Sequence, residues 1–209
     1  MEMRVWDAVA SRESIAKAAA ALTANGIEAS VVANGAEARE KVLSLLPADA
    51  EVFTMTSITL ETIGLTKAIN ESGRYTSVRA AMNGMDQKTQ GREMRKLGAG
   101  PDFTVGSAHA VTEDGFIVIA SMTGSQLPAY AYGAGSVIWV VGAQKIVKNV
   151  DEGLKRIREY VVNHESARAR RVYGLPETFS SYPSKILLFN REVQPGRAKI
   201  VIVNEALGF

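Results

Sequence analysis

The feature that most constrains this chain is the regular alternation of helix and strand patterns in its first third. Helix, strand, helix, strand and helix are predicted in that order at residues 11–25, 29–33, 34–46, 51–55 and 59–70. The helix beginning at Asn34 has Glu37 at the spacing of a capping box, and Pro47 ends it. Such alternation predicts an α/β fold, with a central and mostly parallel sheet flanked by helices.

The rest of the chain continues with shorter strand patterns separated by glycines. We predict strands at residues 75–82, 103–105, 109–112, 116–121 and 137–141, and helices at residues 86–96 and 150–163. Residues 166–209 are expected to form an extended connection and closing strands. Within them, residues 185–190 and 198–204 flank a Pro195-Gly196 turn and are expected to pair as a hairpin or to lie side by side. We expect residues 1–209 to form a single domain.

Composition narrows the classes of function. The formal net charge is only +2, so no strong field recruits nucleic acid or a membrane surface, although Arg168, Arg170 and Arg171 form a small basic group. The sequence contains no cysteine, which excludes thiolate chemistry and cysteine-held iron–sulfur clusters in this chain and suits the cytoplasm. No spacing of carboxylates or of His109 and His164 indicates a metal site. A small-molecule ligand is the better expectation.

Several segments, in order, resemble the lactate-utilisation (LUD) domain family. They are Ser57-Ile58-Thr59-Leu60-Glu61, Pro101-Asp102-Phe103, Gly106-Ser107, Ala110-Val111-Thr112-Glu113-Asp114-Gly115, Gly142-Ala143-Gln144-Lys145-Ile146-Val147 and Leu207-Gly208-Phe209. The resemblance covers almost the whole chain. It implies the fold shared by CoA transferases, ribose-5-phosphate isomerase and glucosamine-6-phosphate deaminase, with ligand bound outside the strand ends.

The resemblance also implies a metabolic process, the utilisation of lactate. Some members of the family are linked to the oxidation of L-lactate to pyruvate alongside iron–sulfur subunits, so iron–sulfur partner proteins are expected for this chain as well. Because fold does not give function, a reaction has to be argued from the site. The sequence does not identify a cofactor.

Glu113 is the candidate catalytic residue, because the related CoA transferases use a Glu shortly before a Gly as their nucleophile. A carboxylate can serve in this way when it is held against an activated acyl group. The alternative is that Glu113-Asp114-Gly115 is an acidic turn between two strands, which is the commoner role of such a sequence. His109 lies four residues earlier on the same face of a strand, where it either assists proton transfer or is a structural histidine.

Polar residues that follow predicted strands form the candidate ligand site. They are Ser57, Thr59, Ser121, Thr123, Gly124, Ser125, Gln126, Gly142 and Lys145. Hydroxyls and backbone N–H groups after a strand can hold a phosphate or carboxylate, and they can equally serve only as helix caps. Lys145 either binds such an anion or lies at a surface turn.

Two functions therefore remain open. In the first, the protein binds a small anionic metabolite or nucleotide-like ligand in a cleft formed by Ser57, Glu113, Ser125 and Lys145, as a non-redox component of lactate or related organic-acid metabolism. In the second, it is a free-standing enzyme like the CoA transferases or sugar-phosphate isomerases and uses Glu113. A homodimer is expected, because residues 174–184 are long for an unsupported loop.

Overall fold

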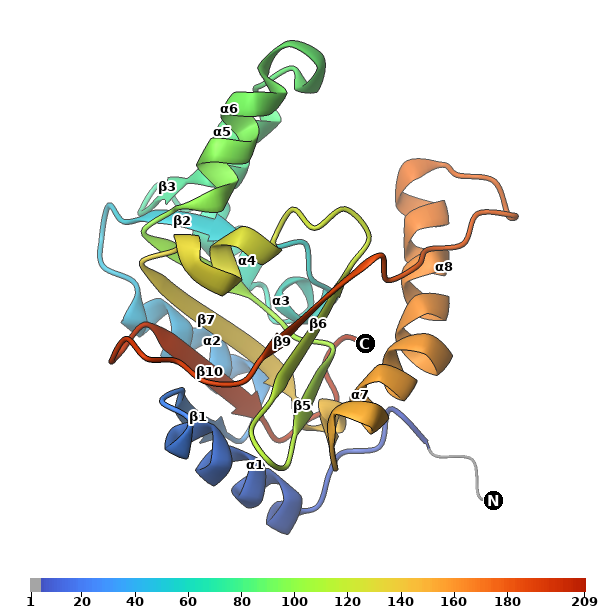
Figure 1. Ribbon diagram of the computed structural model, residues 1–209. Helices are drawn as coiled ribbons and strands as arrows, with labels where there is room; N and C mark the ends of the chain where they lie inside the picture. The colour runs from blue at the N-terminus through green and yellow to red at the C-terminus, as the bar shows by residue number, and fades with distance from the viewer. Residues whose placement is uncertain (1–4) are drawn as a thin grey trace.

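Two β-sheets form the centre of the protein, which a computed structural model describes over residues 5–209 (Figure 1). Residues 1–4 of the domain expected over residues 1–209 lie outside the described residues. Within residues 5–209, no helix is long and apolar enough to cross a membrane.

The larger sheet has six strands, and all of its strand pairs are parallel. Their order is β1 (Glu28–Val32), β10 (Ala198–Val203), β7 (Ser136–Gly142), β4 (Phe103–Gly106), β2 (Glu51–Thr54) and β3 (Thr76–Ser77). Every residue of β7 is buried, which requires cover on both faces of the sheet. The predicted α/β fold with a parallel sheet flanked by helices is confirmed.

The smaller sheet packs on one face of the larger one. Its four strands lie in the order β8 (Ile146–Val147), β5 (Ala110–Thr112), β6 (Ile117–Ser121) and β9 (Lys185–Phe189). Trp139 of β7 meets Phe189 of β9 edge to face, with 5.1 Å between ring centroids, so this contact joins the two sheets.

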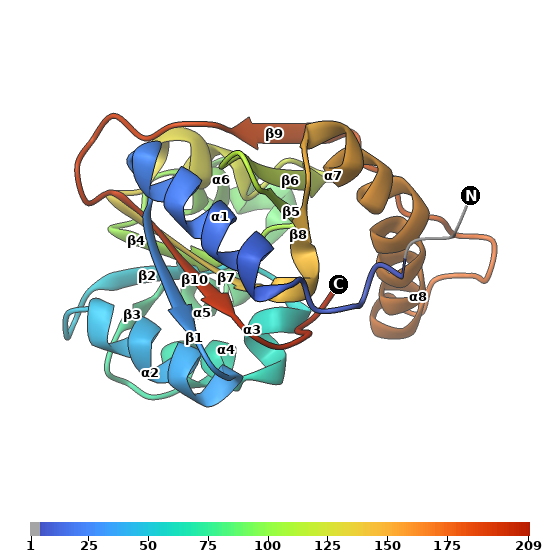
Figure 2. The ribbon, with the colours of Figure 1, turned by 90° about the horizontal axis from the view of Figure 1, so that it is seen from below.

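Helices cover the remaining faces (Figure 2). On one side of the larger sheet lie α2 (Gly35–Leu45), α3 (Ile58–Thr62) and α4 (Leu65–Asn70), whose apolar residues share a core cluster with β7 and β10. On the other side, α1 (Arg12–Ala24) packs beside the smaller sheet. The capping predicted for the second helix is confirmed, because the Asn34 side chain accepts a hydrogen bond from the backbone N–H of Glu37.

A continuous helical run covers the outer face of the smaller sheet. It consists of α7 (Val150–Arg156), a π-helical turn η3 (Ile157–Val161) and α8 (Val162–Tyr173). The helix predicted at residues 150–163 therefore exists but continues to Tyr173, so the extended connection begins later than predicted. Gly174, with φ of +61°, ends the helix, and residues 174–184, here called the strap, lead on to β9.

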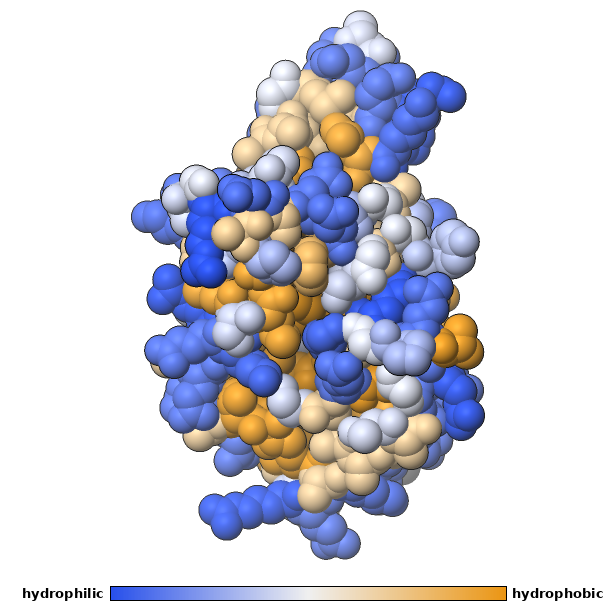
Figure 3. Space-filling model, turned by 90° about the vertical axis from the view of Figure 1, so that its left-hand side faces the viewer, coloured by the Kyte–Doolittle hydropathy of each residue, from blue (hydrophilic) through white to orange (hydrophobic). Residues whose placement is uncertain are grey.

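Two helices, α5 (Val78–Asn83) and α6 (Gln87–Ala99), project from the body (Figure 1). In Figure 3 this projection stands at the top of the molecule, with hydrophilic side chains along one side. The strand predicted at residues 75–82 is wrong, because only Thr76 and Ser77 pair with β2. The Ser77 side chain then caps α5 by accepting from the N–H of Ala80, so the chain turns into a helix.

Two further expectations need correction. The helix predicted at residues 59–70 is divided into α3 and α4 at Gly64, whose φ of +69° is left-handed. The strands at residues 185–190 and 198–204 exist but do not pair with each other. Instead, β9 runs antiparallel to β6 in the smaller sheet, and β10 lies between β1 and β7 in the larger one.

Candidate functional site

A cavity of about 380 Å³ lies at the carboxyl ends of β2, β4 and β7. Met55 and Thr59 follow β2, Ser107 follows β4, and Lys145 follows β7 at the end of the 3-10 turn η2 (Ala143–Lys145). The smaller sheet, α8 and the strap form the opposite wall. The cavity is within the usual range for small-molecule sites, about 300–1,000 Å³, and it occupies the position where open α/β sheets bind ligands.

Lys145 is the buried cation of this cavity, with 1% of the residue exposed. Its Nζ donates to Thr59 Oγ1 at 2.9 Å and to Ser107 Oγ at 3.1 Å. The Thr59 hydroxyl in turn donates to the carbonyl of Leu207 at 3.1 Å, which orients its oxygen toward the amine. Among residues 5–209, no carboxylate forms an ion pair with Lys145.

The surroundings change the protonation of the amine. Burial, and secondarily the positive charge of Arg156, lower the pKa of Lys145 to about 7. A cation held in low dielectric without a carboxylate costs free energy, and an anionic ligand offsets that cost. Lys145 is thus suited to bind an anion while protonated and to act as a nucleophile while neutral.

His109 lines the same cavity and is neutral near pH 7. Burial, together with the positive charges of Lys145 and Arg156, lowers its pKa to about 3. Its Nδ1 accepts a hydrogen bond from the backbone N–H of Ala120 at 3.1 Å, which places the ring proton on Nε2. His109 can therefore donate a hydrogen bond to a ligand, whereas it is a poor base.

Tyr130 closes the base of the cavity, on the short π-helix η1 (Ala129–Gly133). Its ring lies 5.5 Å from that of Trp139, and burial raises the pKa of its phenol. Gly106 leaves room for the phenol oxygen, because a Cβ at residue 106 would lie 1.7 Å from it. The glycine that precedes Ser107 is required here by close packing.

The loop after β6 adds further polar groups. Ser121 Oγ donates to Gln126 Oε1 at 2.9 Å and accepts from the N–H of Gly124 at 2.8 Å. Thr123 Oγ1 bonds to Ser125 Oγ at 3.2 Å. These hydrogen bonds hold the loop in shape, and Ser121, Thr123, Ser125 and Gln126 line the cavity.

The outer wall is mostly apolar and aromatic. Residues Val161, Ala169, Tyr173, Leu175, Phe179, Tyr182 and Pro183 contribute to it. The strap is held to α8 because Arg170 Nη1 donates to the carbonyl of Phe179 at 2.9 Å and Ser166 Oγ accepts from the N–H of Ser181 at 2.8 Å. The length of the strap thus has an explanation within one chain, and the expected homodimer stays a prediction that light scattering tests.

Two arginines line the cavity, although Arg79 was not named from the sequence and Arg168 was assigned only to a basic group. Arg79 of α5 donates through Nε and Nη2 to the carbonyl of Thr54, at 3.2 and 2.7 Å, and lies 4.8 Å from the centroid of the Phe53 ring. Arg168 of α8 forms a two-bond ion pair with Glu165, at 2.7 Å for each bond. Arg79 fell in a segment predicted as a strand, and no local pattern indicates that it returns to β2.

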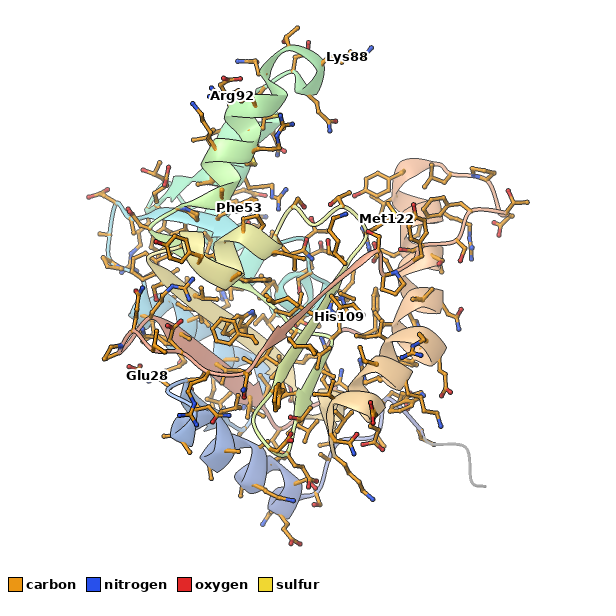
Figure 4. All side chains as sticks on the ribbon, in the orientation of Figure 1. Glu28, Phe53, Lys88, Arg92, His109 and Met122 are labelled. Carbon is orange, nitrogen blue, oxygen red and sulfur yellow. The ribbon has the colours of Figure 1, made fainter. Side chains whose placement is uncertain are left out.

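Most of the predicted ligand residues do line the cavity. They are Ser57, Thr59, Ser121, Thr123, Ser125, Gln126 and Lys145, together with His109. Ser57 also caps α3, since its Oγ accepts from the N–H of Leu60, so both predicted roles are compatible. Gly124 and Gly142 do not line it. Figure 4 shows His109 and Met122 in the space between the smaller sheet and α8, and Lys88 and Arg92 far away on the projection.

Glu113 lies elsewhere, and the prediction that it shares this cleft is wrong. It occupies the turn between β5 and β6, where Gly115 has φ of +90°. Its Oε2 accepts from Nζ of Lys17 in α1 at 2.9 Å, and this hydrogen bond lowers the pKa of Glu113. The alternative of an acidic turn between two strands is confirmed. The antiparallel pairing of β5 and β6 directs this turn to α1 rather than to the strand ends of the larger sheet.

Metal ligands are not clustered. Within residues 5–209, no group of three or more His, Asp or Glu residues is placed to hold a metal ion. The polar side chains that line the cavity are an amine, a neutral imidazole, hydroxyls, the amide of Gln126, the carboxylate of Glu165 and two guanidinium groups.

Comparison with known proteins agrees with this architecture. The sequence profile of the LUD domain matches residues 15–203. A crystal structure of a DUF162 family protein from Deinococcus radiodurans is similar in fold, with a TM-score of 0.55 and 15% sequence identity, over 93% of this chain and 98% of that chain. No curated protein matches the chain significantly.

Proposed function

This chain belongs to the LUD domain family, and we propose that it binds a small anionic metabolite in the cavity at Lys145. In this proposal the protein acts in the cytoplasm, in lactate or related organic-acid metabolism, as a component that does not itself carry electrons. The ligand sits at the carboxyl ends of β2, β4 and β7, and the hydroxyls of Thr59 and Ser107 orient it.

The observation that carries the proposal is the buried amine of Lys145, whose hydrogen-bond partners are two hydroxyls. The charged side chains that line the cavity also favour an anionic ligand. Three of them, Arg79, Lys145 and Arg168, are basic, and one, Glu165, is acidic. A carboxylate or phosphate entering the cavity meets net positive charge at low dielectric, where charge pairs interact strongly.

Electron transfer in this proposal belongs to partner proteins. The sequence has no cysteine, so this chain offers no thiolates for an iron–sulfur cluster. Oxidation of lactate to pyruvate removes two electrons, which iron–sulfur partners would accept. The role left to this chain is to hold the organic acid.

The alternative of a CoA-transferase-like or isomerase-like enzyme that uses Glu113 has no supporting observation. Glu113 is paired with Lys17 at the β5–β6 turn and is not among the residues of the cavity. A nucleophile has to reach the bound substrate, and this carboxylate does not.

The test is a thermal-shift titration of the purified full chain at constant ionic strength, with pyruvate, L-lactate, coenzyme A, AMP and the uncharged analogue lactamide. A ligand that binds only the folded state at 100 times its Kd adds about 2.7 kcal/mol to the free energy of unfolding. We expect pyruvate or L-lactate to raise Tm in the wild-type protein and lactamide to leave it unchanged.

Two variants assign any effect to the site. Lys145→Met removes the buried amine, and Lys148→Met removes an exposed amine three residues later that does not line the cavity. The rise in Tm should disappear in the first variant and persist in the second. Absence of a shift with every anion, or a shift that survives in Lys145→Met, contradicts the proposal.

A further inference from the structure

We propose that Lys145 forms a covalent imine with the carbonyl carbon of a 2-oxo acid bound in this cavity. The inference rests on the proposed function and deepens it, because it names the class of ligand and the chemistry that the site performs on it.

The hydrogen bonds of Lys145 leave its lone pair available. A neutral amine has two N–H groups, and the two acceptors within reach of Nζ are Thr59 Oγ1 at 2.9 Å and Ser107 Oγ at 3.1 Å. With both protons directed to these hydroxyls, the lone pair occupies another tetrahedral direction. Because Lys145 lines the cavity, a ligand held there can present its carbonyl carbon to the amine.

Other lysines are placed differently. Lys17 has 64% of its side chain exposed and is paired with Glu113, and Lys199 lies 4.0 Å from a carboxylate oxygen of Glu28. The ion pair with Glu113 raises the pKa of Lys17 and keeps that amine protonated and therefore unreactive. The low pKa of Lys145, about 7, leaves a large neutral fraction at neutral pH.

The step balances without an oxidant or reductant. The nitrogen lone pair forms a bond to the carbonyl carbon, and the electron pair of the C=O bond moves to oxygen. The nitrogen then loses one proton, and the oxygen takes it up. A second proton converts that hydroxyl to water, which leaves as the nitrogen forms a C=N double bond. Overall, the amine, the 2-oxo acid and one proton give a protonated imine and one water.

Ser107 is the group best placed to relay these protons. Its hydroxyl has only long acceptors, Thr59 Oγ1 at 3.3 Å and the carbonyl of Ala108 at 3.4 Å, while the Thr59 hydroxyl is engaged with Leu207. His109 is neutral in this environment and supplies an N–H that can bond to the carbonyl oxygen as negative charge develops there.

Charge explains why the ligand should be an oxo acid rather than a neutral aldehyde. The protonated imine restores a positive charge at a buried position, where a carboxylate on the adjacent carbon of the ligand neutralises it. Arg79, at the cavity wall, provides a second cation for the carboxylate before the imine forms. The apolar outer wall gives room for a side chain on the oxo acid.

The experiment is reductive trapping. The full chain is incubated with pyruvate and sodium borohydride, and intact mass and peptide mapping locate the product. We expect one equivalent of adduct, with the mass of pyruvic acid less one oxygen atom, at Lys145. L-Lactate, which has no carbonyl, should give none, and excess oxalate, which binds as an anion but forms no imine, should suppress the labelling.

Variants separate this proposal from that of anion binding. Lys148→Met should label as the wild-type protein does, and Lys145→Met should lose the adduct. Pyruvate that raises Tm without labelling Lys145 overturns the imine and leaves the anion site standing. Labelling spread over surface lysines and unchanged in Lys145→Met also overturns the imine. Because the position of the label is read in the wild-type protein, the test holds even if Lys145→Met folds poorly.

Discussion

Lys145 is a residue whose protonation is coupled to folding. The unfolded chain holds the Lys145 proton up to its ordinary pKa near 10.5, whereas the folded protein releases it at about 7. Below pH 7 both states are protonated, and the full cost of the buried charge opposes folding. Between these two values only the unfolded state binds the proton, so this residue makes the protein more stable as the pH rises.

We therefore expect the free energy of unfolding of the wild-type protein to increase with pH relative to that of Lys145→Met. The increase should reach at most about 1.4 kcal/mol per pH unit between about pH 7 and pH 10. Urea denaturation of both proteins across this range measures the difference, and Lys148→Met is the control for a solvated lysine. A difference that does not change with pH would mean that the amine is not buried in solution.

His109 should affect the free energy of unfolding at acidic pH. Its pKa is lowered from 6.5 to about 3 in the folded protein, so the unfolded state binds a proton first as the pH falls. The contribution of His109 is complete above pH 6.5 and declines by up to about 1.4 kcal/mol per unit below it. His109→Asn keeps an acceptor for the N–H of Ala120, and urea denaturation from pH 7 to 4 should show a shallower loss of stability in this variant.

At the scale of elements, the site depends on short segments that follow β2, β4 and β7. Each segment carries one group of the Lys145 network, namely Thr59, Ser107 and Lys145 itself. Helix α3 positions Thr59, and η2 positions Lys145, so the distances between these groups depend on the packing of the strands. Tyr130 of η1 supports the β4 segment through its contact at Gly106.

Gly106→Ala should disturb this packing, because the added Cβ would lie 1.7 Å from Tyr130 Oη and 3.1 Å from Met55 Cγ. Overpacking of this kind typically costs about 1–3 kcal/mol. Gly84→Ala is the matched control, since the nearest atom there is at 3.6 Å and φ is −84°. Thermal denaturation should show a lower Tm for Gly106→Ala only, and Tyr130→Phe in the same chain should restore part of it.

At the scale of the whole molecule, the two sheets share one core around Trp139. This residue is fully buried in β7 and contacts Tyr130 of η1 and Phe189 of β9. Its position makes the stability of the smaller sheet, and so of the cavity wall formed by β6 and the strap, dependent on the larger sheet.

Trp139→Ala should therefore destabilise both sheets together, by about 3–5 kcal/mol as for other large aromatic residues in cores. Trp139→Phe keeps most of the apolar volume and should cost less. Amide hydrogen exchange at increasing urea concentration measures the two sheets separately, and circular dichroism follows the unfolding of the whole protein. Two separated transitions in the wild-type protein would contradict the single cooperative unit that we expect.

Features that depend on residues close in the sequence could be predicted from the sequence alone. Asn34 caps the helix that it was predicted to begin, and Ser57 caps the helix that follows it, because capping is a contact within three residues. The parallel sheet followed from the alternation of elements. The polar residues after its strands indicated Ser57, Ser125 and Lys145 as parts of one cleft, in which Glu113 was wrongly included. These features need no knowledge of distant contacts.

The contacts between distant elements could not be predicted in this way. Backbone hydrogen-bonding groups are the same in every strand. The sequence of β9 therefore does not indicate that it pairs with β6 rather than with β10. The antiparallel pairing of β5 and β6 also places Glu113 away from the cavity, and the return of α5 to the end of β2 places Arg79 in it. The burial of Lys145 is likewise a property of the assembled fold, because the charge of an amine is penalised only when distant segments exclude water from it.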